Sequence, residues 1–163
     1  MHSEDRREGV DVPHLRHNYL TFALPTGWED ASQVIALGPE EEGFRPNLVF
    51  SQEPTHVGET PEQFAARQLP ELREALRSYS LKRESLAHFG PNSGFLREHE
   101  FSMEKGEIAQ LQFYVLLRGR CYTFTFTHLR HRLEGARQTA ERMFARLRIT
   151  PEKVGRDHEV EVM

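Results

Sequence analysis

The sequence lacks most of the features of a disulfide-bonded, metal-binding or membrane-spanning protein. Its 163 residues include one cysteine, Cys121, so no internal disulfide can form and no cysteine cluster offers a zinc site. No stretch approaches the roughly 20 apolar residues of a membrane-spanning helix, and the opening MHSEDRREGVDVP is charged where a secretory signal has its apolar core. We therefore expect a cytoplasmic protein without stable membrane insertion.

An excess of positive charge is also absent. Lysine and arginine total 21 against 25 aspartates and glutamates, which gives a formal net charge of −4. The arginines near the C-terminus are interspersed with Glu134 and Glu141 and have no aromatic stacking platform beside them, as is usual for a solvated helix face. We therefore expect an ordinary globular protein with no nucleic-acid partner.

Signatures of catalysis are absent as well. The sequence contains no G-x-S-x-G motif and no phosphate-binding glycine loop. His128 and His131 have no nearby acidic ligand in the sequence pattern, and Glu98 and His99 are neighbours on a predicted strand, so they point to opposite faces. Cys121 lies beside a turn, outside any nucleophile motif. We expect no enzymatic activity, no cofactor and no metal.

Hydrophobic periodicity predicts three strands, a helix, four more strands and a second helix. This order predicts an α+β fold: a single domain with a mainly antiparallel sheet of about six to seven strands and two packed helices. The domain is predicted to span residues 17–150, between a flexible tail at residues 1–16 and a polar tail at residues 151–163.

Both helices carry clear local signals. Thr60, Pro61 and Gln63 form a capping box with proline at the first helical position. Pro70 predicts a kink or two abutting helical pieces, and the periodicity places Leu72 on the core stripe. The apolar stripe of the second helix consists of Leu133, Ala136, Ala140, Phe144 and Leu147.

The segment QLQFYVLLRGRCYTFTFTH, residues 110–128, is nearly free of charge on both sets of alternating side chains. One set includes Leu111 and Phe113, and the other includes Gln112 and Thr125. Two interpretations fit the second set: it binds a partner, or it is covered by the protein's own helix or by water. Since the sequence does not say which face is concave, the two sets are interchangeable here.

Four segments occur in an order that resembles the DcrB-like domain family: FALPTGWEDAS, NLVFSQEP, GETPEQFAARQLPELREAL and LQFYVLLRGRCYTFTFT, with a terminal helix after them. The resemblance covers about residues 18–149. Its strongest marks are Leu-Pro-x-Gly-Trp at residues 24–28, the helix entry Gly58-Glu59-Thr60 and the hairpin that ends in YTFTFT. Their order and spacing together make the resemblance specific.

The resemblance implies a fold similar to the PsbP type and one of two settings. DcrB-like envelope proteins carry a signal or a lipobox, which this N-terminus lacks, so the resemblance points to the Eag chaperones of type VI secretion. It implies a non-catalytic cytoplasmic homodimer that shields the apolar N-terminal transmembrane helices of a secreted effector and aids its loading. The alternative is an envelope-associated ligand-binding or structural module of unknown partner.

The chaperone hypothesis assigns a binding role to the uncharged set of side chains. Charges on that face would be desolvated at high cost, whereas glutamine and threonine can exchange hydrogen bonds with polar groups of an apolar helix. Tyrosine adds a large ring with a polar tip. The candidate partner-binding residues are Gln52, Gln110, Gln112, Tyr114, Thr123 and Thr125.

Overall fold

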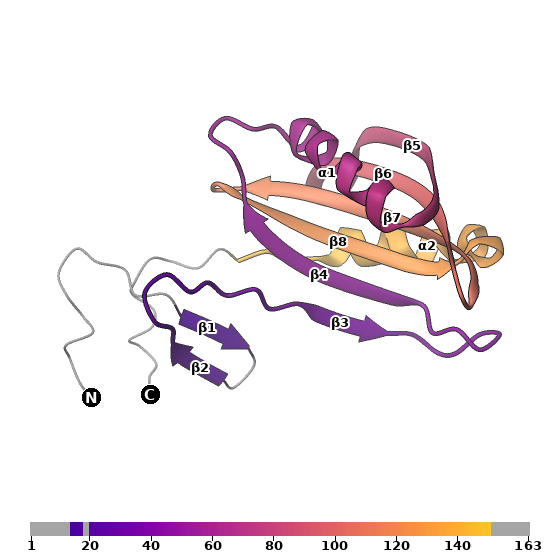
Figure 1. The fold of residues 1–163 in the computed structure, drawn as a ribbon, viewed down its shortest axis with the longest axis horizontal. Coiled ribbons are helices and arrows are strands. Elements are labelled where there is room, and N and C mark those ends of the chain that lie inside the picture. The colour runs from indigo at the N-terminus through magenta and orange to yellow at the C-terminus, as the bar shows by residue number, and fades with distance from the viewer. Residues whose placement is uncertain (1–13, 18–19, 151–163) are drawn as a thin grey trace. The chain divides into compact units, whose positions relative to one another are not determined.

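The computed structural model describes residues 14–17 and 20–150, whose helices and strands are labelled in Figure 1. The chain divides into two compact units. One unit is Gln33–Ile149, which holds both helices and a six-stranded sheet. The other unit comprises Met1–Ser32 and Thr150–Met163.

The unit that includes the N-terminus contains a small antiparallel sheet. Strand β1 (His14–His17) pairs with strand β2 (Leu20–Ala23), and Leu15 lies opposite Phe22. Strand β1 was not among the predicted strands and overlaps the end of the predicted N-terminal tail. Residues 1–13 of that tail and the predicted C-terminal tail at residues 151–163 lie outside the described residues.

Six strands of the larger unit form one antiparallel sheet in the order β3-β4-β8-β7-β6-β5. Strands β5 to β8 are neighbours both in the chain and in the sheet, so they form an antiparallel meander. In chain order the elements are β3 (Val34–Leu37), β4 (Asn47–Pro54), α1 (Pro61–Ala75), β5 (Arg77–Phe89), β6 (Asn92–Met103), β7 (Gly106–Leu117), β8 (Arg120–Leu129) and α2 (Arg130–Arg146). The predicted α+β fold, with a mainly antiparallel sheet of about six to seven strands and two packed helices, is confirmed by this six-stranded sheet, and β2 pairs with β1 in the separate small sheet.

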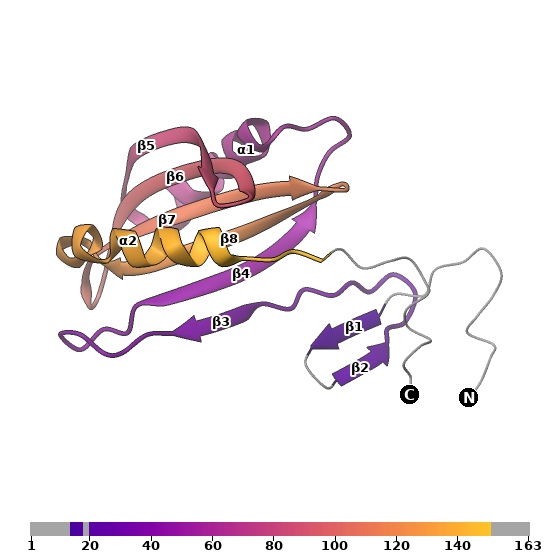
Figure 2. The same ribbon diagram turned by 180° about the vertical axis from the view of Figure 1, so that it is seen from behind.

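The two helices lie on opposite faces of the sheet, as the views from the two sides show (Figures 1 and 2). Helix α2 packs on the face that carries Leu111 and Phe113. Helix α1 packs its Phe64 on the other face, against Tyr114 and Cys121. Because neighbouring residues of β7 alternate between these faces, one strand supplies side chains to both contacts.

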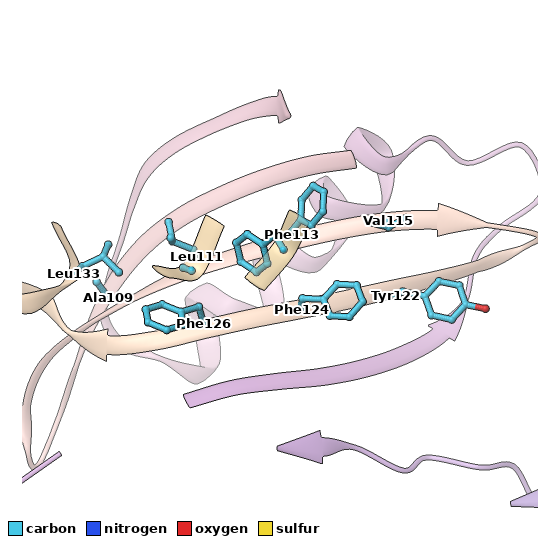
Figure 3. Close-up of a cluster of buried hydrophobic side chains, with 10 residues drawn as sticks. Ala109, Leu111, Phe113, Val115, Tyr122, Phe124, Phe126 and Leu133 are labelled. Carbon is cyan, nitrogen blue, oxygen red and sulfur yellow. The ribbon is translucent and has the colours of Figure 1, made fainter. Parts of the chain in front are cut away.

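The main core lies between α2 and the sheet (Figure 3). Leu111 and Phe113 are fully buried there, which settles that their set of side chains is the core set. The contact with α2 uses the predicted stripe, of which Leu133, Ala140 and Phe144 are buried. The core cluster consists of Ala109, Leu111, Phe113, Val115, Tyr122, Phe124, Phe126, Leu133, Ala140 and Phe144.

Helix α1 starts as predicted, but Pro70 does not divide it. The Gln63 amide donates to the Thr60 hydroxyl oxygen at 3.1 Å, and the Thr60 amide donates to the Gln63 side chain at 3.0 Å. Pro70 lies inside one continuous helix. Proline has no N–H to donate to the carbonyl of Ala66, and since Ala66 is exposed, water can satisfy that carbonyl. Leu72 is only half-buried and borders a surface hollow, so the prediction that it lies in the core is wrong.

Phe144 tests the packing of α2 on the sheet. Its ring centre lies 5.3 Å from that of Phe113 and 5.4 Å from that of Phe89, and the side chain is fully buried. We expect Phe144→Ala to lower the free energy of unfolding by about 3–5 kcal/mol, because it removes buried apolar surface and leaves a cavity. Chemical denaturation measures this loss.

The control for this substitution is Arg142→Ala, at an exposed position of the same helix. It should change the free energy of unfolding by no more than about 0.5 kcal/mol. Equal stability of the two variants would contradict the packing of α2.

Candidate functional site

Strands β4, β7 and β8 present a set of uncharged side chains on the α1 side of the sheet. This uncharged face consists of Asn47, Val49, Ser51, Gln110, Gln112, Tyr114, Thr123, Thr125 and Thr127. Together with Gln68 and Leu72 of α1 it lines an open hollow of about 340 Å³. Among the described residues that line the hollow, Glu53 is the one with a charge. The face is therefore polar enough to form hydrogen bonds and is nearly uncharged.

The structure brings five of the six candidate residues together on this face and places the sixth elsewhere. The five are Gln110, Gln112, Tyr114, Thr123 and Thr125. Gln52 lies opposite Tyr122 in the β4–β8 ladder and accepts a hydrogen bond from Nε of Arg120 at 2.9 Å. Because strand residues alternate, Gln52 shares the α2 side with Phe50, and the expectation that it extends the uncharged face is corrected.

Helix α1 covers one end of the uncharged face. The rings of Phe64 and Tyr114 lie 5.8 Å apart, and Cys121 is buried in the same cluster. Tyr114 is therefore only 2% exposed, whereas Gln112 and Thr125 remain half-buried. The interpretation that the protein's own helix covers this face holds for the Tyr114 end and not for the rest.

A first chain of hydrogen bonds crosses the strands from β6 to β8. Nη1 of Arg97 donates to the Tyr114 hydroxyl at 2.9 Å, and that hydroxyl donates to Oε1 of Gln112 at 2.6 Å. Nε2 of Gln112 then donates to the Thr125 hydroxyl oxygen over a longer distance, 3.4 Å. The orientation of the Gln112 amide is therefore determined by its partners within the sheet.

A second chain of hydrogen bonds runs parallel to the first, one pair of residues further along the strands. The Tyr79 hydroxyl lies 2.7 Å from Nδ1 of His99, and Nε2 of His99 lies 2.7 Å from Oε1 of Gln110. Nε2 of Gln110 donates to the Thr127 hydroxyl oxygen at 2.9 Å. The two chains together hold the amides of β7 in place.

The charge of Arg97 is met by groups from three elements. Nε donates to a carboxylate oxygen of Glu84 at 2.9 Å, and Nη2 donates to the backbone carbonyl of Ala65 in α1. The Arg97 side chain is completely buried, so these bonds replace the water that a free guanidinium would bind. Burial also raises the pKa of the Tyr114 hydroxyl, which therefore stays protonated and can donate to Gln112.

His99 is a buried neutral imidazole. Because Gln110 uses its amide nitrogen toward Thr127, its oxygen faces His99 and accepts from Nε2, and Nδ1 then accepts from Tyr79. Burial lowers the pKa of His99 to about 4, and the positive charge of Arg97 acts in the same direction. The imidazole is therefore uncharged at neutral pH.

Arg97 and His99 organise this site, and the sequence analysis did not identify either as part of it. They occupy the same face of β6 as Phe95 and Phe101, both of which are buried. Two polar residues in phase with buried aromatic residues are a signal of a buried hydrogen-bond network. The signal is weak in a single sequence, because the partners of these side chains lie on other strands.

Glu98 lies on the opposite face from His99, as strand alternation predicted. One of its carboxylate oxygens accepts from Nη2 of Arg83 at 2.9 Å and the other accepts from Nη2 of Arg137 of α2 at 3.1 Å. Glu98 therefore links β5 to α2 and is not positioned as an acid or base beside His99.

His128 and His131 each lie near a glutamate, contrary to the expectation of no acidic neighbour. Nε2 of His128 lies 3.4 Å from Glu41, and Nε2 of His131 lies 3.0 Å from Glu42. His128 is buried at the end of β8, where its Nδ1 accepts from the Leu129 amide. These pairs connect the turn at residues 41–44 to the end of β8 and to the start of α2.

The remaining chemical candidates carry no reactive geometry. Cys121 is buried, and burial raises its pKa to about 12, so the thiol is not a thiolate at neutral pH. Within the described residues, no group of three or more histidine, cysteine, aspartate or glutamate side chains is arranged to hold a metal ion. In the same part of the chain, no helix combines the length and apolar character needed to cross a membrane.

Comparison with known proteins gives a family and several structural relatives. The sequence model of the family described as DcrB matches residues 20–145. The crystal structure of PA94, a protein of unknown function from Pseudomonas aeruginosa, is similar with a TM-score of 0.71 at 17% identity, over 88% of this chain and 100% of that chain. That similarity supports the same fold. No curated protein sequence matches the chain.

Two other solved structures are less similar. LpqN, which is involved in cell envelope biogenesis of Mycobacterium tuberculosis, has a TM-score of 0.40 at 13% identity, over 70% of this chain and 82% of that chain. The PsbP protein of the cyanobacterium Synechocystis sp. PCC 6803 has a TM-score of 0.45 at 14% identity, over 73% of this chain and 79% of that chain. Similarity at this level does not establish a shared function.

The pKa of His99 predicts a loss of stability in mild acid. The unfolded chain takes up a proton near pH 6.5, whereas the folded chain does so near pH 4, so stability is complete above the first value and falls between the two. By about pH 5 this term should remove roughly 2 kcal/mol from the free energy of unfolding. We expect His99→Gln to lack that part of the decline, measured by denaturation at about pH 7.5 and about pH 5.

The control is His56→Gln, which removes an imidazole from a side chain that is 71% exposed. Its decline between the two pH values should match that of the unmodified protein. If His99→Gln also declines to the same extent, His99 is not the buried neutral group described above.

Proposed function

Because the chain belongs to the DcrB family, we propose that it is a non-catalytic cytoplasmic chaperone that binds the apolar N-terminal transmembrane helices of a type VI secretion effector. The chaperone shields those helices from water and aids the loading of the effector onto the secretion apparatus. It acts as a homodimer and needs no cofactor. The observation that carries this proposal is the uncharged face with its open hollow.

The composition of the uncharged face fits an apolar helix that carries a few polar groups. A charged side chain buried under such a helix would lose its hydration without gaining a partner, which costs several kcal/mol. The hollow is lined by Val49 and Leu72 as well as by amides and hydroxyls, so it offers apolar contact and hydrogen bonds side by side. Helices in a membrane associate through the same mixture of close packing and hydrogen bonds.

The hydrogen-bond chains leave donors available at the hollow. The Thr125 hydroxyl oxygen accepts from Gln112, and within the described residues its own proton has no acceptor. Each amide nitrogen of Gln110 and Gln112 carries two protons, of which one is used toward a threonine. The face therefore presents donors that suit hydroxyl and carbonyl oxygens of a bound helix.

Helix α1 supports helix binding by its position. Gln68 and Leu72 border the hollow from one side, so a bound helix lies on the sheet with α1 beside it. Both side chains are half-buried, which leaves apolar surface of α1 available for contact. Burial of that surface contributes about 25 cal/mol per Å².

A second candidate function is that of a ligand-binding module of the envelope. It is favoured by a groove of about 560 Å³ on the α2 side, lined in part by Leu37, Leu48, Phe126 and Met143. That volume lies within the range of small-molecule sites. This candidate predicts export of the protein and binding of a small apolar compound in place of a helix.

The proposal is tested by co-expression with the effector-like product of the neighbouring gene. The effector is produced intact or without its apolar N-terminal helices, and the chaperone is purified by an affinity tag. We expect the intact effector to co-purify and the shortened one to be lost. Retention of the shortened form, or of neither form, would contradict the proposal.

A substitution in the hollow gives a residue-level test. Thr125 is half-buried between Val49 and Gln112, so Thr125→Asp places a carboxylate where the apolar helix would cover it. We expect the affinity for the intact effector to fall by about 100-fold or more, because the covered charge has no partner. Titration calorimetry or a pull-down series measures the change.

The matched control is Ser85→Asp, which puts the same charge at an exposed position of β5. Both variants should keep the thermal stability of the unmodified protein within a few degrees, and the control should keep its affinity. Unchanged binding by Thr125→Asp would place the effector on another surface.

A further inference from the structure

Strand β3 is an end strand of the sheet and carries only apolar side chains. Within the described residues it forms ladder hydrogen bonds with β4 alone, so its outer edge offers unpaired backbone groups. Val34, Ile35 and Leu37 are 47%, 58% and 54% exposed. Exposed apolar edge strands pair readily with other strands, and proteins that avoid such pairing protect their edges.

The opposite edge of the same sheet is protected in this way. Strand β5 carries Lys82, Arg83 and Glu84 in succession, all of them exposed. Its pairing with β6 also has two register shifts, between residues 77 and 80 and between residues 81 and 83. Charges and bulges of this kind discourage edge-to-edge pairing, and β3 has neither.

We propose that β3 is the subunit interface of a homodimer, in which the β3 strands of two copies pair antiparallel and join the two sheets into one. The occupant of the edge is a second copy because the segment is complementary to itself. No charge lies between Asp30 and Glu40, so the antiparallel arrangement brings no like charges opposite each other. A two-fold axis relates identical patches in this way.

The two-fold symmetry restricts the register of the pair. In an antiparallel ladder, residues that lie opposite each other point to the same face. Val34 and Ala36 share the α2 face with their partners Phe50 and Leu48. Two residues that lie opposite each other in the dimer must therefore differ by an even number of positions, or be the same residue. Pairing of most of this four-residue strand then places either Ile35 or Ala36 opposite its own copy. Both uncharged faces lie on one side of the joined sheet.

Such a dimer also completes the site of the proposed function, on which this part of the inference rests. The hollow reaches Gln33 at the start of β3, so the uncharged surface continues to the interface. The four strands β7, β8, β4 and β3 of one copy span about 14 Å at a spacing of about 4.8 Å. Helix α1 covers one end of the uncharged face and so shortens the part that is open. The eight strands of two copies span about 34 Å, which matches the roughly 30 Å of a membrane-spanning helix.

The interface is tested with Ile35→Lys, which places a charge on the edge as natural edge strands do. The mass of the full chain is measured by light scattering after size exclusion, without any effector. We expect twice 19.0 kDa for the unmodified protein and 19.0 kDa for the variant. The control Leu86→Lys, at a side chain of β5 that is 67% exposed, should remain dimeric. A monomeric unmodified protein, or a dimer that persists in Ile35→Lys, would overturn the proposal.

Cysteine cross-linking tests the register independently. Cys121 is buried, so a cysteine introduced at residue 35 or 36 supplies the accessible thiol. We expect either Ile35→Cys or Ala36→Cys to form a disulfide-linked dimer on oxidation, since one of these residues faces its own copy. Leu86→Cys is the control that should remain uncross-linked, and absence of cross-linking in both β3 variants would overturn the pairing.

Effector binding separates this inference from the proposed function. Val34→Lys tests this role, because Val34 lies on the α2 side with Phe50 and its charge does not enter the uncharged face. If Val34→Lys is monomeric and loses the effector while Leu86→Lys keeps it, the dimer completes the helix site. Full binding by the monomeric variant would overturn that role of the dimer. If the unmodified protein is dimeric through β3 and binds no apolar helix, the interface stands and the chaperone function fails.

Discussion

The buried guanidinium of Arg97 constrains how α1 meets the sheet. An unpaired charge in such a place costs several kcal/mol, so each of its nitrogens needs a partner. Glu84 supplies a carboxylate from β5, Tyr114 a hydroxyl from β7, and Ala65 a backbone carbonyl from α1. Movement of α1 along the sheet would break the last of these bonds. The position of the hollow beside α1 therefore depends on this side chain together with the packing of Phe64 on Tyr114.

The two faces of the sheet use different physical interactions. Under α2, aromatic and aliphatic side chains pack without directional bonds, and the pair of Phe113 and Phe144 is typical of this contact. On the α1 side, two chains of hydrogen bonds run across the strands and end at Thr125 and Thr127. Apolar packing tolerates many substitutions of similar volume, whereas a hydrogen-bond chain depends on every member. The α1 side is therefore the more specific surface.

The sequence predicted the features that depend on local patterns. The capping box at Thr60, the stripe of α2 and the uncharged set on β7 and β8 are each visible within a few residues, and the structure contains all of them. Gln52 was misplaced because its face depends on the register between β4 and β8, which are far apart in the chain. Arg97 and His99 were missed for a related reason, since their partners lie on other strands and on α1.

The hydrogen-bond chains also determine the entropy that the proposed binding of a helix would cost. A flexible glutamine that becomes ordered on binding loses about 0.5–1.5 kcal/mol of side-chain entropy. Gln110 and Gln112 are already held by His99 and Tyr114, so this cost is met during folding and not during binding. An apolar helix carries few polar groups, so its hydrogen bonds to the face contribute little free energy of binding. A face that is ordered in advance is the kind of surface on which such weak contacts suffice, which links the buried charge of Arg97 to the proposed recognition of a helix at the hollow.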